Sequence, residues 1–329
     1  MGWKNKNVLI TGINGFIGTA LARRLLLEGA NVSGLVKEIS HAADILYHGN
    51  CKLFTGDICD YTTLSEIISL QEIDVIFHFA AFAIVRSSSK DPMSTYRINV
   101  MGTVNVLEAA RNVGRCKSIV VASSDKAYGD HEELPYTEDF ALQPKNTYDT
   151  SKACMDMIAR SYAHNYDMPI CVTRCSNVYG PGDMSLSRIV PNTIKLILDG
   201  KGPMLYSDIE SMEREFIYID DVVEAYLKLG TGYCALKPIK APQGEAYNIG
   251  GTGPVKIYDL AAKISELMGS KKKPFVSRRD PLFKEIQRQY IDASKLLTIH
   301  AWKPQIDLDE GLKRTVEWYK SFYIDGEYK

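Results

Sequence analysis

One stretch decides the fold of this sequence: Gly12-Ile13-Asn14-Gly15-Phe16-Ile17-Gly18. The apolar, β-branched residues 7–11 before it predict a buried strand, and residues 19–28 after it carry apolar side chains at helical spacing. A strand, a glycine-rich turn and a helix in this order direct backbone N–H groups toward a diphosphate. The spacing is G-x-x-G-x-x-G rather than the commoner G-x-G-x-x-G, and a glycine-rich turn without a ligand is the alternative. The position of the loop between strand and helix favours a dinucleotide site formed by Gly12, Gly15, Phe16, Ile17 and Gly18.

The composition is that of an ordinary globular protein. The 329 residues are 45% hydrophobic and 24% charged, with a formal net charge of −1, which suits one large domain or two closely associated ones. That balance predicts neither a nucleic-acid partner nor an anionic membrane surface. The longest apolar run, residues 75–85, is too short to span a bilayer.

The cysteines and histidines carry no metal or disulfide pattern. The seven cysteines form no C-x-x-C pair and are odd in number, so we expect reduced thiols in a cytoplasmic protein without a signal peptide. The six histidines show no H-E-x-x-H spacing, and we predict no metal site.

The order of elements predicts an α/β fold with a doubly wound parallel Rossmann sheet. Residues 1–175 alternate strand and helix, with strands expected at 31–36, 52–55, 73–79, 118–122 and 170–173, and helices at 92–112 and 148–166. After residue 175 the rhythm changes, and residues 176–329 are expected to form mainly a smaller substrate-binding lobe over the C-terminal edge of the sheet. Residues 189–198 predict a helix there, and residues 246–250 predict a return to the main sheet.

Tyr148 and Lys152 lie four residues apart, on one face of a predicted helix. A phenol near pKa 10 is a poor base at neutral pH, but an adjacent ammonium and a cationic nicotinamide would each lower that pKa. Tyr148 is therefore a candidate for taking a proton from an alcohol while hydride leaves its carbon. An exposed tyrosine and lysine on a surface helix are the alternative.

Ser124-Asp125-Lys126 follows the predicted strand 118–122, at the edge where ligands bind. Ser124 would hydrogen-bond the reacting oxygen, and two charged residues directly after a buried strand are unfavourable without a task. Simple capping by the serine and a surface salt bridge between the charged pair are the alternatives.

These residues together resemble the extended short-chain dehydrogenase/reductase family over nearly the whole chain. The resemblance rests on the glycine loop, Asp57, His78-x-Ala80-Ala81, Asn99 and the Ser124/Tyr148/Lys152 set. Within the family, the chain is most similar to the sugar-nucleotide 4,6-dehydratases, and among these to the CDP-glucose enzymes, because of Ser124-Asp125-Lys126 where the dTDP-glucose enzymes carry Asp-Glu. Further similar stretches are Val85-Arg86-x-Ser88, Asn99-Val100-Met101-Gly102-Thr103, Asn177-Val178-x-Gly180 and Arg188-Ile189-Val190-Pro191. Arg214-Glu215-Phe216 is more typical of the family in general, which leaves the nucleotide base open.

The resemblance implies one tightly bound NAD or NADP. Beside the glycine loop, the implied cofactor-binding residues are Lys37, Asp57, Ile58, Ala80, Ala81, Asn99, Tyr148 and Lys152. Val36 stands where NAD-preferring sites usually place an acid, and Lys37 would meet a 2′-phosphate or be a solvated strand end. The choice between NAD and NADP stays open.

The implied reaction converts a nucleoside-diphosphate hexose to its 4-keto-6-deoxy product. Tyr148 would take the C4 hydroxyl proton with Ser124 and Lys152 assisting, and Asp125 would protonate the departing C6 hydroxyl. Lys126 would act near C5, either as a neutral base or as an ammonium that stabilises the enolate. Asn177, Arg188, Arg214 and Arg279 are candidate substrate-binding residues, because Arg forks suit phosphate oxygens.

Two other functions fit the same fold. A 4-epimerase of the family would return hydride to C4 and need no acid at Asp125, and a non-catalytic NAD(P)-binding regulatory protein would commonly lack the tyrosine or the lysine. The resemblance also implies a homodimer that pairs helices 92–112 and 148–166, whose outward faces carry apolar residues Met93, Ile98, Met155 and Ile158. Packing of these side chains in the core of the same chain is the alternative.

Overall fold

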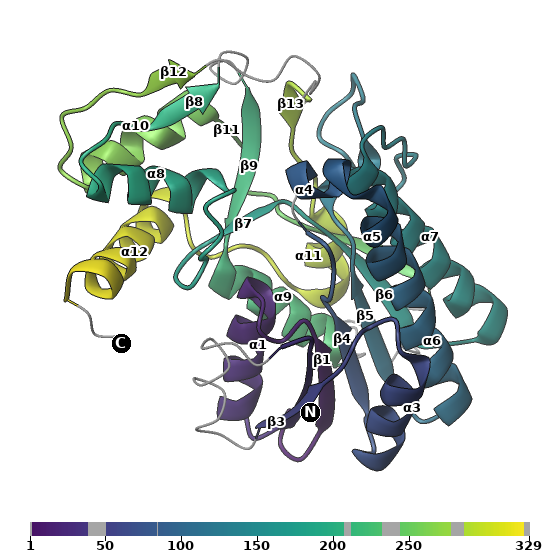
Figure 1. Ribbon diagram of the computed structural model, residues 1–329. Helices are drawn as coiled ribbons and strands as arrows, with labels where there is room; N and C mark the ends of the chain where they lie inside the picture. The colour runs from purple at the N-terminus through teal and green to yellow at the C-terminus, as the bar shows by residue number, and fades with distance from the viewer. Residues whose placement is uncertain are drawn as a thin grey trace.

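The computed structural model describes residues 2–38, 51–83, 85–206, 212–231, 244–277 and 286–325 (Figure 1). Its centre is a seven-stranded parallel sheet in the order β10-β6-β5-β4-β1-β2-β3. The strands are β1 (Asn7–Thr11), β2 (Asn31–Val36), β3 (Cys51–Thr55), β4 (Val75–His78), β5 (Ser118–Ala122), β6 (Ile170–Cys175) and β10 (Glu245–Ile249). The order runs outward in both directions from β1 and β4, which confirms the predicted doubly wound fold.

Both faces of this sheet are buried, as a parallel sheet requires. Successive residues of β1 point to opposite faces, so Val8 and Ile10 belong to one apolar cluster and Leu9 to another. Helices α1 (Phe16–Leu27) and α9 (Ile219–Gly230) cover the first face. The other face is covered by α3 (Tyr61–Leu70), α6 (Gly102–Val113) and α7 (Thr147–Tyr166).

Two predicted helices differ in their bounds from the structure. Helix α1 begins at Phe16 rather than Thr19, because Gly15 is extended and caps the helix with its backbone alone. The expected continuous helix 92–112 consists of α5 (Pro92–Tyr96), a π-helical turn over Arg97–Met101, and α6, and it follows a short α4 (Val85–Lys90). The extra residue of a π turn is a local feature that apolar spacing does not reveal.

The predicted outward apolar face of these helices is corrected in part. Met155 is fully buried in the core under α7, and Ile98 and Ile158 pack against the same cluster. Met93 is 79% exposed, as expected, and Met157 on α7 is 63% exposed. The face of α7 that carries Met155 packs against the sheet, and the face that carries Met157 is exposed.

The remaining elements form a second layer beside the carboxyl edge of the sheet (Figure 1). A small sheet joins β7 (Asn177–Tyr179), β9 (Glu213–Tyr218), β11 (Pro254–Lys256) and β13 (Arg288–Gln289), and β8 (Met204–Tyr206) pairs with β12 (Phe275–Ser277). Its helices are α8 (Ile189–Leu198), α10 (Ile257–Leu267) and α12 (Leu308–Lys320), the last followed by a π-helical turn over Ser321–Asp325. The chain crosses back for α9, for β10, and for α11 (Ser294–His300), which packs on β10.

A buried ion pair stabilises the main sheet behind the edge at which β5 and β6 end. Arg174 of β6 donates to both carboxylate oxygens of Asp156 on α7, at 2.8 and 3.0 Å, and neither side chain is more than 1% exposed. The remaining nitrogen of the Arg174 guanidinium, Nη1, donates to the Tyr128 hydroxyl and to the Glu138 carbonyl, both at 3.0 Å. Because every charge has a partner, the desolvation cost of burial is offset by this geometry.

We expect Asp156→Asn to lower the free energy of unfolding by about 3–5 kcal/mol, because it leaves the Arg174 guanidinium buried without its counter-charge. The matched control is Glu310→Gln, which removes an exposed Arg314 partner and should cost less than about 1 kcal/mol. Urea denaturation of both variants checks the difference, and equal losses would contradict the stabilising role assigned to the buried pair.

Candidate functional site

The glycine loop lies where the carboxyl ends of β1 and β4 meet. Gly12 has a φ of +71°, and a Cβ built on it would lie 2.8 Å from the Ala80 backbone nitrogen. A Cβ on Gly18 would lie only 2.3 Å from the Gly12 carbonyl oxygen. Both contacts are with backbone atoms that cannot move aside, so the loop keeps its shape only with glycine at these positions.

The N-terminus of α1 points from this loop into the same edge of the sheet. Gly15 supplies no side-chain cap and the first turn carries no acidic residue, so the amides of Phe16, Ile17 and Gly18 have no built-in anion. A helix start of this kind binds phosphate through free N–H groups and the positive end of the helix dipole. The predicted cofactor-binding glycines are therefore brought together in a diphosphate cradle.

Asp57 begins the turn after β3, as its predicted cofactor role requires. Its Oδ1 accepts from the Cys59 backbone N–H at 2.9 Å, and its Oδ2 pairs with Arg97 at 3.1 Å. The pKa of Asp57 is lowered, first by the Cys59 hydrogen bond and then by the positive charges of Arg97 and Lys37. Ile58 beside it is 7% exposed. Lys37, at the exposed end of β2, thus belongs to the electrostatic surroundings of Asp57.

A buried polar chain connects the glycine-loop strand to the middle of the site. The Thr11 hydroxyl lies 2.7 Å from His78 Nδ1, and His78 Nε2 lies 3.0 Å from the Thr103 hydroxyl, which donates to the Asn99 carbonyl at 2.6 Å. Burial lowers the pKa of His78 to about 3, with the nearby Lys152 charge adding to the effect. The imidazole is therefore a neutral bridge between β1, β4 and the π-helical turn.

Asn99 extends this chain to the helix that carries Tyr148. Its Oδ1 accepts from the Phe82 N–H at 2.6 Å, and its Nδ2 donates to the Ser151 hydroxyl at 2.8 Å. The Ser151 hydroxyl donates in turn to the Tyr148 carbonyl at 2.7 Å. Asn99 lies in the π turn, a distortion often found at functional sites, and it links Phe82, in the chain after β4, to α7.

Ser124, Asp125 and Lys126 form the turn directly after β5. Ser124 caps the 3₁₀ helix Asp125–Tyr128, accepting from the Lys126 N–H at 3.2 Å and donating to Asp125 Oδ1 at 3.1 Å. Asp125 is 2% exposed, and its Oδ2 lies 3.4 Å from Lys126 Nζ. The two charged groups predicted from the sequence thus form a largely buried pair beside the reacting hydroxyls rather than a surface salt bridge.

Tyr148 and Lys152 both lie at this edge, but the expected electrostatics are only half right. Burial raises the pKa of Tyr148 above its ordinary value, and the negative charges of Asp149 and Asp125 raise it further. Arg188 and a hydrogen bond with Ser124 oppose the rise. Burial lowers the pKa of Lys152 to about 8, and its Nζ donates to the Ala122 carbonyl at 2.7 Å. The effects that raise the phenol pKa therefore outweigh those of Arg188 and Ser124, and the pKa of Tyr148 is raised overall.

The predicted substrate-binding residues are placed differently from one another. Arg188 pairs with the buried Asp183 at 2.6 Å and lies over the Phe16 ring, 5.9 Å from its centroid. Arg214 of β9 is 8% exposed and donates to the carbonyls of Glu213, Gln287 and Ile286. Asn177 donates to the Glu215 carbonyl at 2.9 Å. Arg279 lies outside the described residues. Of the four, Arg188 reaches the space between the glycine loop and Tyr148.

Two polar residues at the site carry no sequence motif. Asn248 of β10 accepts from the Tyr128 hydroxyl at 2.7 Å and donates to the carbonyls of Tyr136 and Asp292. Gln289 of β13 contacts both Asp125 and Lys126. The contacts span 120 and 163 residues of sequence, and no local spacing announces them.

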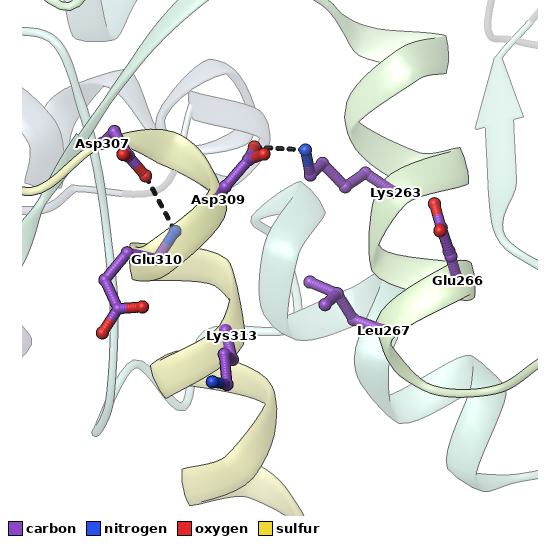
Figure 2. A pocket seen from close by; sticks show the side chains of 7 residues that line it. All are labelled: Lys263, Glu266, Leu267, Asp307, Asp309, Glu310 and Lys313. Atoms are coloured by element: carbon purple, nitrogen blue, oxygen red, sulfur yellow. Dashed lines mark hydrogen bonds and ion pairs between the residues drawn. The ribbon is translucent and has the colours of Figure 1, made fainter.

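The pocket in Figure 2 lies away from this site, between α10 and α12. Its lining mixes both signs of charge, with Lys263 paired to Asp309, and it contains none of the predicted site residues. Across the described parts of the chain, no cluster of His, Cys, Asp or Glu has an arrangement that could hold a metal ion. Within those same ranges, the helices lack the length and apolar character that crossing a bilayer demands.

Comparison with known proteins gives a match along most of the chain. Residues 9–315 match the family described as GDP-mannose 4,6 dehydratase. A probable UDP-glucuronate 4-epimerase of Rhizobium meliloti is 32% identical over 96% of this chain and 97% of its own length. A dTDP-glucose 4,6-dehydratase of Escherichia coli is 30% identical over 95% and 92%. The chain spans about half the length of the plant trifunctional enzymes that it also matches, at 29% identity in Arabidopsis thaliana.

Solved structures give the same two activities. The NAD complex of a dTDP-glucose 4,6-dehydratase from Bacillus anthracis aligns with a TM-score of 0.84 at 28% identity, covering 97% of both chains. A UDP-glucose 4-epimerase from Thermotoga maritima with UDP-glucose aligns with a TM-score of 0.86 at 27% identity, covering 96% of this chain and 99% of its own.

The buried His78 predicts a specific loss of stability in acid. As the pH falls below about 6.5, the unfolded chain protonates this imidazole while the folded chain does not until about pH 3. The stability is therefore complete above pH 6.5 and is lost toward pH 3, by an amount on the order of 4 kcal/mol. His78→Gln keeps a donor and an acceptor between Thr11 and Thr103 but cannot protonate.

We expect the free energy of unfolding of His78→Gln to fall less steeply than that of the wild type between pH 6 and 4, measured by urea denaturation. The exposed His164 gives the matched control, and His164→Gln should follow the wild-type slope. Parallel slopes for all three proteins would contradict a neutral, buried His78.

Proposed function

Because the chain belongs to the GDP-mannose 4,6-dehydratase family of extended short-chain dehydrogenases/reductases, we propose that it is an NAD-dependent nucleoside-diphosphate-hexose 4,6-dehydratase. The observation that carries this proposal is the buried Asp125–Lys126 pair next to Ser124 and Tyr148. A 4-epimerase has to oxidise and reduce C4 alone, whereas a dehydratase also needs groups that move protons at C5 and C6. Desolvating a charged pair costs stability even when the charges are paired, and such pairs are concentrated at functional sites.

The site residues divide the reaction between them. Tyr148 accepts the C4 hydroxyl proton, and Ser124, hydrogen-bonded to Tyr148, holds the same oxygen. The glycine loop would hold NAD, which would supply the hydride-transfer chemistry between C4 and C6. Lys152, fixed by the Ala122 carbonyl, supplies positive charge near the tyrosine when protonated. Asp125 donates a proton to the departing C6 hydroxyl, and Lys126 acts at C5 or at the enolate oxygen.

The proposed substrate is CDP-glucose, because Ser124-Asp125-Lys126 resembles the Ser-Asp-Lys run of the CDP-glucose 4,6-dehydratases. Arg188 is the residue best placed for the diphosphate, since it lies over the Phe16 ring of the glycine loop and its charge acts on Tyr148. We assign NAD rather than NADP because the related dehydratase and epimerase structures are NAD complexes. For Arg214, Asn177 and Arg279, substrate contact stays a prediction.

A 4-epimerase is the second candidate, because this activity also occurs among the relatives and the solved structures. It shares Tyr148, Ser124 and Lys152 with the dehydratase and differs at Asp125 and Lys126. A non-catalytic dinucleotide-binding protein is disfavoured by the intact Ser124, Tyr148 and Lys152 set.

The decisive experiment supplies CDP-, dTDP- and UDP-glucose and GDP-mannose in deuterated water and weighs the products. The expected product has lost one water and carries solvent deuterium at C5. Asp125→Asn should still reduce the bound cofactor but accumulate it with an unrearranged 4-keto sugar, because an amide cannot protonate the leaving hydroxyl. As a control, Tyr148→Phe should lower C4 oxidation itself, by about 10²–10⁴-fold. Normal turnover of Asp125→Asn, or a C4 epimer without deuterium at C5, would exclude the dehydratase.

We also propose a homodimer that pairs α5 and α7 with their counterparts across a two-fold axis. Support comes from exposed apolar side chains on this side of the chain: Met93 and Tyr96 on α5, Met101 in the π turn, and Met157 and Tyr166 on α7. Isolated exposed apolar groups are ordinary, but several on adjacent helices favour an interface.

The expected mass by light scattering at micromolar concentration is twice 36.8 kDa. Met157→Lys should shift the protein toward monomer because it buries a charge at the proposed interface. The matched control, Met184→Lys, changes a methionine that is 48% exposed on a loop outside these helices. A monomeric wild type would rule out the dimer.

A further inference from the structure

Gln289 brings the second layer of the protein into contact with the predicted catalytic turn. It is the last residue of β13, a two-residue strand that pairs with β9 in the register Gln289↔Arg214. Its side chain is fully buried, yet no apolar cluster includes it. A buried amide is costly unless both of its ends are hydrogen-bonded.

Both ends of the Gln289 amide are satisfied at residues 125 and 126. Its Nε2 donates to the Asp125 carbonyl at 3.0 Å, and its Oε1 accepts from Lys126 Nζ. The chemistry fixes this orientation, because a lysine ammonium can only donate and a backbone carbonyl can only accept. In a flipped amide, the Gln289 NH₂ group would face the Lys126 ammonium, and its oxygen would face the Asp125 carbonyl, so neither contact would be a hydrogen bond.

These contacts decide which direction of Lys126 is left for a ligand. Nζ has three positions besides its bond to carbon, and two of them face oxygen acceptors, Gln289 Oε1 and Asp125 Oδ2. The Lys126 side chain is 21% exposed, whereas that of Asp125 is 3% exposed. Among the described residues, these two acceptors leave one position on Nζ available, and it carries an N–H in the ammonium or a lone pair in the neutral amine.

We propose that Gln289 is a positioning residue, which holds Lys126 Nζ beside Asp125 so that its third position meets C5 or the enolate oxygen of the bound sugar. The proposal rests on the dehydratase function proposed above and extends it by one residue. Gln289 acts through Lys126 and contacts no reacting atom. The same short segment accepts from Arg214 through the carbonyls of Ile286 and Gln287, so it anchors one predicted substrate residue and one predicted catalytic residue.

The variants separate positioning of Lys126 from support of the fold. Gln289→Met keeps the length and removes both polar ends, whereas Gln289→Glu keeps an oxygen for Lys126 and loses the donor to the Asp125 carbonyl. A purely structural role predicts that Glu is as harmful as Met or worse, because it buries a charge. A positioning role predicts that Glu restores activity. Gln305→Met is the matched control, because this exposed glutamine has a side chain that donates to the neighbouring Lys303 and Pro304 carbonyls.

The experiment uses the full chain with its bound cofactor and the nucleotide sugar of the four-member panel that the wild type dehydrates. Single-turnover absorbance follows cofactor reduction, which reports C4 oxidation, and mass spectrometry follows loss of water. For Gln289→Met we expect oxidation and KM within about threefold of wild type and elimination slower by about 10²-fold, so that reduced cofactor accumulates. Elimination by Gln289→Glu should be at least about tenfold faster than by Gln289→Met. Gln305→Met should eliminate water at the wild-type rate.

Elimination at the wild-type rate in Gln289→Met, or equal slowing of oxidation and elimination, would overturn the positioning role while leaving the dehydratase function intact. Gln289→Glu no better than Gln289→Met would overturn it as well. If Gln289→Met does not fold, Gln289→Asn replaces it, because an amide one methylene shorter cannot reach both partners. A wild-type product that retains its water would instead overturn the proposed function, and the role of Gln289 with it.

Discussion

The backbones of β1 and β4 approach each other at Gly12 and Ala80 so closely that no side chain fits between them. This contact sets the shape of the turn after β1, and the turn sets the point at which α1 begins. Because Gly18 must in turn fit against the Gly12 carbonyl, the first turn of α1 lies directly against the loop. The dinucleotide cradle is thus a consequence of backbone packing, and its ligand-binding groups are amides that no substitution of side chains can supply.

The chemistry at the carboxyl edge depends on polar groups that are buried but satisfied. His78 and Asn99 connect β1 to α7 through hydroxyl and amide partners, and Arg174 balances Asp156 behind the turn after β5. In an interior of low dielectric, a polar group without a partner lowers the stability of the fold. A polar group with a hydrogen-bond partner is instead held in one orientation. The result is a site in which Tyr148 and Lys152 from α7 meet Asp125 from the turn after β5.

The parts of this arrangement that are local in sequence could be predicted from the sequence. The glycine loop, the end of β5 at Ala122, and the tyrosine–lysine pair follow from short-range spacing, which reports backbone periodicity well. The π turn that places Asn99 could not, because one inserted residue leaves the apolar pattern of residues 92–112 intact. Nor could the sign of the Tyr148 pKa shift, since burial against Asp149 and Asp125 depends on the folded surroundings. Asn248 and Gln289 remained hidden because their partners are more than a hundred residues away.

The repeated crossing of the chain between its two layers limits how this protein can be recombined with its relatives. Asn248 lies on β10, a strand of the main sheet that interrupts the second layer in sequence, and it binds Tyr128 and Tyr136. A chimera made with a single junction after Cys175 would therefore exchange Asn248 and Gln289 along with the substrate-facing segments. Transplanting substrate preference would require at least two junctions, so that both residues stay with the catalytic half that they contact. In this fold, the segments that can be exchanged together are those of one spatial layer, and they are not continuous in sequence.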